Sequence, residues 1–118
     1  MLPKRARLRR QIDFERARTA GKHWRDGFLK INTASNALGH NRYGFVVSRR
    51  IGTVVKRNRL KRRLRALVRQ QTANLAVGYD VIVIALPAAA GADYHELKRS
   101  LRTLLERAGL VQGNGTLA

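Results

Sequence analysis

The sequence of 118 residues contains no cysteine, which excludes disulfide bonds and metal sites built on thiolates. Its longest apolar stretch, residues 81–92, contains Pro87 and is too short to cross a bilayer. The N-terminus is basic but lacks the apolar segment of a secretory signal. These absences suit a reducing compartment, so we expect this protein to be cytoplasmic.

Residues suited to catalysis are also few and scattered. His23, His40 and His95 lie far apart, and no group of His, Asp or Glu has the spacing of metal ligands. Asp93 and Glu96 stand three residues apart before an apolar run, as in the capping box of a helix. Glycine-rich phosphate-binding loops are missing. The residues alone therefore predict a binding module without catalytic residues or a metal site of its own.

Acidic residues are rare, and the resulting positive charge is unevenly distributed. Only 7 Asp and Glu stand against 25 Lys and Arg, a formal net charge of +18. Residues 1–50 carry 13 basic and 3 acidic side chains, residues 51–75 carry 8 and 0, and residues 76–118 carry 4 and 4. Such clustering of one sign is the electrostatic signature of a surface for a polyanion. We expect the C-terminal third to be scaffold and the rest to carry the binding surface.

The strongest single pattern is the run KRNRLKRRLR at residues 56–65, in which seven of ten residues are cationic and none is acidic. Helical periodicity over about residues 54–71 places four aliphatic residues on one face and cations on the others. The aliphatic residues are Leu60, Leu64, Leu67 and Val68. A solvated surface helix usually mixes acids and bases, and like charges four apart destabilise an isolated helix. The pattern therefore favours binding to RNA or DNA.

The remaining patterns predict a single α+β domain. The expected elements are a helix at about residues 12–20, strands at 28–33 and 43–48, the basic helix, a buried strand at 81–86 and a closing helix at about 93–108. The order α-β-β(-β)-α-β-α makes a two-layer α/β sandwich with one β-α-β unit. We expect residues 1–10 to be a flexible basic arm, residues 11–109 a single RNA-binding domain, and residues 110–118 a disordered tail.

Four short motifs follow one another along the chain. They are Asp13-Phe14 before Gly21-Lys22, Val47-Ser48-Arg49-Arg50-Ile51-Gly52 at a strand end, Arg57-Asn58-Arg59-Leu60-Lys61-Arg62 in the basic helix, and Tyr79-Asp80 before a hydrophobic strand. In this order and spacing they resemble the protein subunit of bacterial ribonuclease P, whose basic helix carries an "RNR" pattern. The resemblance covers roughly residues 5–108.

The resemblance implies a fold of the ribosomal S5 domain 2-like type with a left-handed β-α-β crossover, although about 98% of such crossovers are right-handed. It also implies an endoribonuclease ribonucleoprotein that removes the 5′ leader of precursor tRNA. By the same resemblance, a catalytic RNA performs the hydrolysis with the help of Mg²⁺. Most of this Mg²⁺ is expected to be bound by the RNA. The protein would then supply no catalytic residue and no metal site, act as a monomer in a 1:1 ribonucleoprotein, and contact no membrane.

The resemblance also assigns residues to two surfaces. The catalytic RNA is expected to contact Arg49, Arg50, Arg57, Asn58, Arg59, Lys61, Arg62 and Arg65. A cleft for the 5′ leader is expected to use Phe14, Arg18, Phe28, Ile31 and Phe45. Some relatives have aromatic residues where Arg18 and Ile31 stand, and stacking on an aromatic ring stabilises binding by about 1–3 kcal/mol per base. We therefore expect weaker stacking here, with a charge contact from Arg18 in its place.

Three other functions are compatible with parts of the sequence. A ribosomal or ribosome-associated RNA-binding protein would share the fold and the basic helix but would leave precursor tRNA processing unchanged. A stand-alone nuclease would cleave without an RNA partner, and the lack of a carboxylate or histidine cluster disfavours it. A basic amphipathic helix can also lie on anionic lipid, but here its aliphatic stripe lacks Trp and Phe and is needed for the core.

Overall fold

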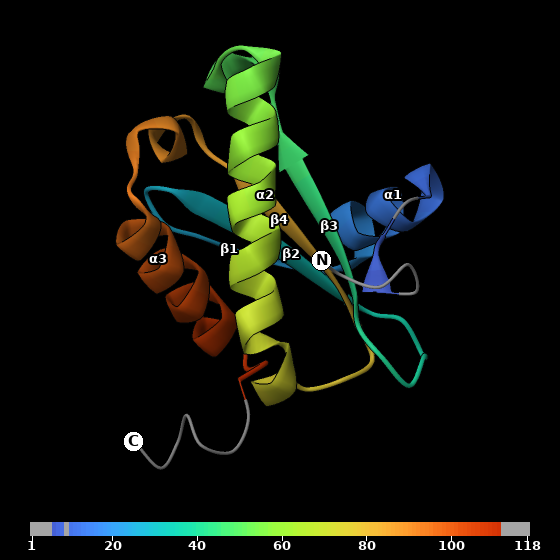
Figure 1. Cartoon of the computed structure of the whole chain (residues 1–118). Coiled ribbons are helices and arrows are strands. Elements are labelled where there is room, and N and C mark those ends of the chain that lie inside the picture. Colours follow the sequence, from blue (N-terminus) through green and yellow to red (C-terminus); the bar gives the residue numbers. More distant parts are fainter. Residues whose placement is uncertain (1–5, 9, 112–118) are drawn as a thin grey trace.

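The computed structural model describes residues 6–8 and 10–111 of the chain (Figure 1). Its main elements are α1 (Gln11–Ala20), β1 (Lys22–Arg25), β2 (Leu29–Ser35), β3 (Arg42–Val47), α2 (Val54–Gln71), β4 (Tyr79–Ala85) and α3 (Tyr94–Arg107). Short 3-10 turns lie between some of them, namely η2 (Arg49–Ile51), η3 (Thr72–Asn74) and η4 (Pro87–Gly91). The expected arm and tail fall largely outside the described residues.

The described parts of the arm and tail lie against the domain. Leu8 is buried, and its backbone N–H donates to the carbonyl oxygen of Tyr43 at 2.7 Å. At the other end, Leu110 is buried and Val111 forms an isolated bridge with Leu75. Residues next to the expected boundaries therefore belong to the folded unit.

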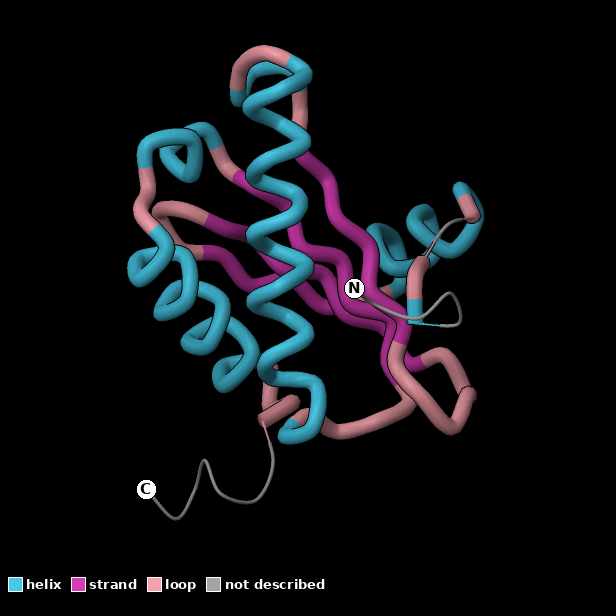
Figure 2. The backbone as a smooth tube through the Cα atoms, viewed as in Figure 1, coloured by secondary structure: helices cyan, strands magenta, loops and turns pink. Residues whose placement is uncertain are grey.

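The four strands form one mixed sheet in the order β1-β2-β4-β3 (Figure 2). β2 pairs antiparallel with both β1 and β4, whereas β3 pairs parallel with β4. Helices α2 and α3 cover one face of the sheet, and α1 packs against part of the other. The expected α+β sandwich is confirmed. β1 lies between the helix expected at about residues 12–20 and the strand expected at 28–33, where the sequence analysis assigned no element.

The connection from β3 through α2 to β4 is a left-handed crossover. In Figure 1, β3 runs upward, α2 descends in front of the sheet, and β4, which is parallel to β3, lies to its left. A right-handed connection would place β4 on the right. The unusual hand implied by the family resemblance is thus present. It sets α2 over β3, one of the two edge strands of the sheet.

The main core lies between the sheet and helices α2 and α3. Leu64 and Leu67 of α2 and Leu97, Leu101 and Leu104 of α3 are all fully buried there. Burying such a side chain stabilises the fold by about 1.5–3 kcal/mol. The N-terminus of α3 is fixed by the expected capping box, because the backbone N–H groups of Asp93 and Glu96 each donate to the other residue's side chain. The core therefore fixes α2 by its aliphatic stripe and leaves its cations outside.

Candidate nucleic-acid interface

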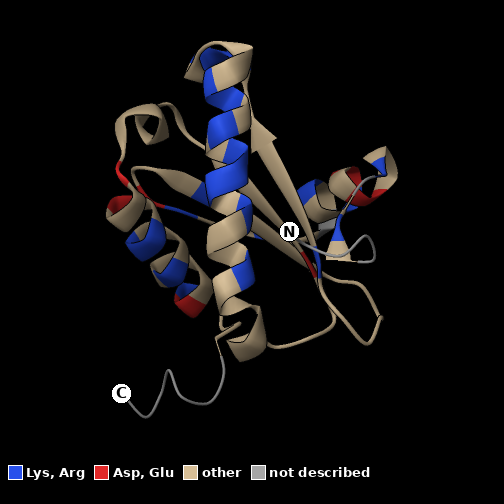
Figure 3. Cartoon of the chain, viewed as in Figure 1, with Lys and Arg blue, Asp and Glu red and all other residues tan. Residues whose placement is uncertain are grey.

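Lys and Arg positions recur along most of helix α2 (Figure 3), which gives this helix a cationic surface. Thr53 caps its N-terminus by accepting the backbone N–H of Lys56 at 3.2 Å. Arg49 and Arg50 are exposed in η2 immediately before it, and Asn58 is exposed on its first turns. Among the described residues, no ion pair involves a cation of α2. The helix therefore carries positive charge that the described acidic residues do not neutralise.

Three arginines of α2, Arg62, Arg65 and Arg69, line one surface hollow. The guanidinium carbon of Arg65 also lies 5.9 Å from the centroid of the Phe45 ring on β3. A cation over an aromatic face at this distance is held by the ring quadrupole. Arg65 is thereby restrained, and Phe45 links the cationic helix to the edge of the sheet.

Arg57 is only half-buried, but its Nε atom is fully enclosed and has no hydrogen-bond partner among the described residues. An enclosed N–H without a partner is costly, by about 1–3 kcal/mol. This donor belongs to Arg57, the first residue of the Arg57-Asn58-Arg59 motif. Because the enclosed Nε atom of Arg57 lowers the stability of the fold, stability does not explain why arginine stands at this position.

A groove of about 510 Å³ lies beside the cationic surface and is lined from α1, α2 and three strands. Phe14 and Arg18 contribute from α1, and Phe45 contributes from β3. The other lining residues include Asn32, Val46, Lys61, Ile82 and Ile84. The groove thus combines an apolar floor with two cations, Arg18 and Lys61, and one acid, Glu15. Apolar side chains and a cation suit a single strand whose bases stack and whose phosphates need positive charge.

Two residues expected in the cleft do not line this groove. Ile31 has an exposed fraction of 0% in the main core, on the face of the sheet that α2 and α3 cover. Phe28 packs against the same core and borders a hollow beside α3. Side chains alternate between the two faces of a strand, so Asn32, the neighbour of Ile31, reaches the groove instead. Ile31 is therefore a core residue and Phe28 a partly buried residue beside α3, so neither faces the groove as expected.

Arg18 lies on the groove but is not a free cation. Its Nη2 atom donates to Oε2 of Glu15 at 2.7 Å, one turn earlier on α1. The hydrogen bond from Arg18 and its positive charge lower the pKa of Glu15 below its ordinary value. Glu15 therefore stays charged at neutral pH and offsets part of the positive charge expected from Arg18. Within the part of the chain that the structure describes, Lys61 across the groove makes no such pair.

The position of α1, and with it one wall of the groove, depends on the buried carboxylate of Asp80. Arg42 of β3 donates to both of its oxygens, at 2.9 Å from Nε and 2.8 Å from Nη2. Arg16 of α1 donates from Nη2 at 2.7 Å, and the Asn36 amide at 3.0 Å. Arg42 also reaches Asp13 of α1 at 3.4 Å. Helix α1, strands β3 and β4 and the loop after β2 are therefore joined at one charged centre.

The electrostatics of this centre favour the ionised form of Asp80. Burial by itself would raise the pKa of Asp80, since its side chain has an exposed fraction of 0%. Hydrogen bonds from Arg42, Asn36 and Arg16, with the positive charge of Arg42, outweigh burial and leave the pKa below its ordinary value. The carboxylate is therefore charged at neutral pH and already has its partners. It serves to position α1.

The described carboxylates are mostly engaged in structural roles. Asp26 accepts hydrogen bonds from the backbone N–H groups of Phe28 and Leu29 and from the hydroxyl of Ser100, the last at 2.6 Å.

Within residues 6–8 and 10–111, no group of three or more His, Cys, Asp or Glu could hold a metal ion. In the same part of the chain, no helix has the length and apolarity to cross a membrane. The fold, the cationic helix and the groove define a nucleic-acid-binding protein.

Comparison with known proteins narrows this class. The family model described as "Ribonuclease P" matches residues 2–109. The chain belongs to the ribonuclease P protein family. It is similar to the ribonuclease P protein component of Roseiflexus castenholzii, with 42% identity over 108 residues that cover 91% of this chain and 88% of the relative. The corresponding protein of Syntrophomonas wolfei is 32% identical over 114 residues, covering 97% and 96% of the two chains.

Solved structures agree with this membership. The ribonuclease P protein of Staphylococcus aureus superposes with a TM-score of 0.84 at 27% identity, covering 91% of this chain and 98% of that one. The protein from Thermotoga maritima gives a TM-score of 0.80 at 28% identity, with coverage of 91% and 98%. The fold that carries the cationic helix and the groove is therefore the fold of this family.

Proposed function

We propose that this chain binds the catalytic RNA of ribonuclease P and the 5′ leader of precursor tRNA, and so assists removal of the leader. The observation that carries the proposal is the juxtaposition of an unneutralised cationic helix with a groove that has an apolar floor, in a member of this family. The cations would contact RNA phosphates without reading sequence. The groove would hold the unpaired leader through Phe14 and Phe45.

In this proposal the hydrolysis takes place on the RNA, with Mg²⁺ bound mainly by the RNA. The engagement of Asp80, Asp26 and Asp93 in internal hydrogen bonds supports this, because none is left as an obvious general base. One copy of the chain would act with one RNA, in the cytoplasm. The alternative of a ribosomal RNA-binding protein shares the cationic helix, but membership of the ribonuclease P family disfavours it.

The test is reconstitution with labelled precursor tRNA at low Mg²⁺ concentration. We would compare a bacterial ribonuclease P RNA alone, this protein alone, and the two together. Cleavage at the mature 5′ end is expected in the mixture, well above either component alone. Cleavage by the protein alone would place the chemistry in this chain. Tight RNA binding without stimulation of cleavage would instead favour the ribosomal type of binding protein.

Replacing Phe14 with alanine is expected to weaken binding of leader-bearing precursor tRNA to the reconstituted complex by about 5- to 150-fold, because one stacking platform contributes about 1–3 kcal/mol. Binding of mature tRNA, which has no leader, should not change. The measurement is the dissociation constant of each tRNA. Ile12→Ala is the matched control, since Ile12 is on the same helix, is 70% exposed and does not line the groove. Equal losses for both tRNAs would contradict leader binding by Phe14.

A further inference from the structure

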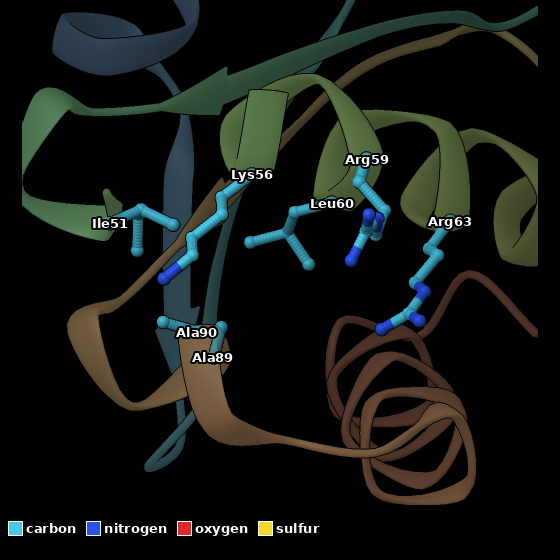
Figure 4. A pocket seen from close by; sticks show the side chains of 7 residues that line it. All are labelled: Ile51, Lys56, Arg59, Leu60, Arg63, Ala89 and Ala90. Atoms are coloured by element: carbon cyan, nitrogen blue, oxygen red, sulfur yellow. The ribbon is translucent and has the colours of Figure 1, made fainter. Parts of the chain in front are cut away.

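A second cationic hollow lies on the other shoulder of α2, between this helix and η4 (Figure 4). Lys56, Arg59 and Arg63 line it from α2, whereas Lys61, which lines the groove, points to the opposite side. The three cations are spaced three and four residues apart, so they form one stripe along the helix. This hollow is therefore separate from the groove proposed for the leader.

The charge of this hollow has no counterpart in the described protein. Its lining contains no acidic residue, and no described ion pair involves Lys56, Arg59 or Arg63. Like charges three and four residues apart on a helix repel one another. An anion between them would relieve that repulsion, so the stripe suits a phosphate group.

The floor of the hollow is apolar rather than polar. Ile51 and Leu60 are each 6% exposed and Ala89 is 1% exposed, while Ala90 is exposed at the rim. The small side chains of η4 leave open a volume of about 190 Å³. Pockets for drug-sized ligands are usually about 300–1,000 Å³, so this one suits a single ring. A phosphate alone needs no such floor, whereas a nucleotide has both an anionic and an apolar part.

We propose that this hollow binds one unstacked nucleotide of the partner RNA. The phosphate lies between Arg59 and Arg63, and the base or ribose lies against the floor formed by Ile51, Leu60 and Ala89. RNA is commonly recognised through bases that are splayed out of their stack and held against apolar side chains or guanidinium planes. This inference rests on the proposed function. It adds Lys56, Arg63 and η4 to the RNA-binding surface.

The test places a carboxylate at the rim. Ala90→Glu should weaken binding of ribonuclease P RNA by at least about tenfold, because the new carboxylate would repel the phosphate of the bound nucleotide. Ala88→Glu is the control, since Ala88 is an exposed residue of the same turn, does not line the hollow and receives the same charge. It should change the dissociation constant by less than about threefold. Equal effects of the two variants would overturn the proposal.

Ala90→Leu tests the apolar part of the site without a change in charge. A bulky side chain at the rim should exclude the base and weaken RNA binding, while a hollow that holds only a phosphate should tolerate it. A loss with Ala90→Glu but none with Ala90→Leu would therefore overturn the assignment to a nucleotide. Thermal unfolding of each variant checks that the fold is intact. Failure of the unaltered protein to bind the RNA would instead overturn the proposed function.

Discussion

Replacing Asp80 with alanine is expected to destabilise the protein by about 3 kcal/mol, measured as the free energy of unfolding in urea. Removal of one partner from a buried ion pair costs about 3–5 kcal/mol, because the remaining charge is left uncompensated. The lower end applies here, since the side chain of Arg16 is 41% exposed and that of Arg42 is 22% exposed. Both can regain some hydration once the carboxylate is gone.

The matched control for Asp80 is Glu106, which forms an exposed ion pair with Arg102 at 3.6 Å. Glu106→Ala should change the free energy of unfolding by less than about 1 kcal/mol, as surface pairs usually do. Asp80→Ala should also release α1 and thereby weaken binding of the leader more than binding of the catalytic RNA. A loss of stability no larger than that of the control would contradict the central role of Asp80.

Lowering the pH should also test how much Asp80 contributes to the stability of the protein. Because the pKa of Asp80 is lowered in the folded protein, the unfolded chain binds its proton more tightly than the native state does. The stability that ionised Asp80 contributes is therefore fully present above the ordinary pKa of Asp, about 3.9. It is lost as the pH falls through the lower pKa that Asp80 has in the folded protein. Urea unfolding at a series of pH values should show a steeper loss for the unaltered protein than for Asp80→Ala.

Replacing Arg62, Arg65 and Arg69 together with alanine is expected to weaken binding of ribonuclease P RNA on the order of 10³-fold or more. Each hydrogen bond to a charged group contributes about 1.5–3 kcal/mol, and these three arginines line one hollow. The slope of log K against log salt, expected near about −3 to −5 for the unaltered protein, should become shallower by about 2–3 units. Filter binding over a range of salt concentrations measures both quantities.

The control for that variant removes the same charge from α3, through Lys98, Arg99 and Arg107, all exposed residues. A small and similar change in slope for both triple variants would mean that net charge, rather than the surface of α2, determines affinity. Unchanged affinity and slope in the α2 variant would remove the electrostatic account altogether. Comparing the two triple variants therefore shows whether RNA affinity depends on cations at the surface of α2 or on the total charge of the protein.

Much of this fold could be predicted because its strongest signals are local. The apolar stripes of α2 and α3 and the capping box at Asp93 depend on residues within a few positions of one another. β1 was less visible, since its four residues show no alternation and its pairing is supplied by β2. The propensity of so short a strand is weak, and tertiary pairing determines its state.

The functional surfaces were only partly predictable. The cations of α2 stand together in the sequence, but the partners of Asp80 lie 38 and 64 residues away, beyond any local pattern. The resemblance places Ile31 in the cleft because aromatic residues of some relatives align with it, whereas its burial depends on pairing within the sheet and on packing under α2 and α3. The hollow at η4 depends on the left-handed return of the chain, which brings Ala89 to the flank of α2.

Because α2 lies at the edge of the sheet, this helix separates the two binding sites on its flanks. Lys61 faces the groove on one flank, and Arg59 and Arg63 face the hollow at η4 on the other, within five consecutive residues. An α-helix with its side chains is about 10–12 Å across and does not bend over so short a span. Two RNA segments bound on its flanks would be held at one separation, so the protein would fix the distance between leader and catalytic RNA as well as bind each of them.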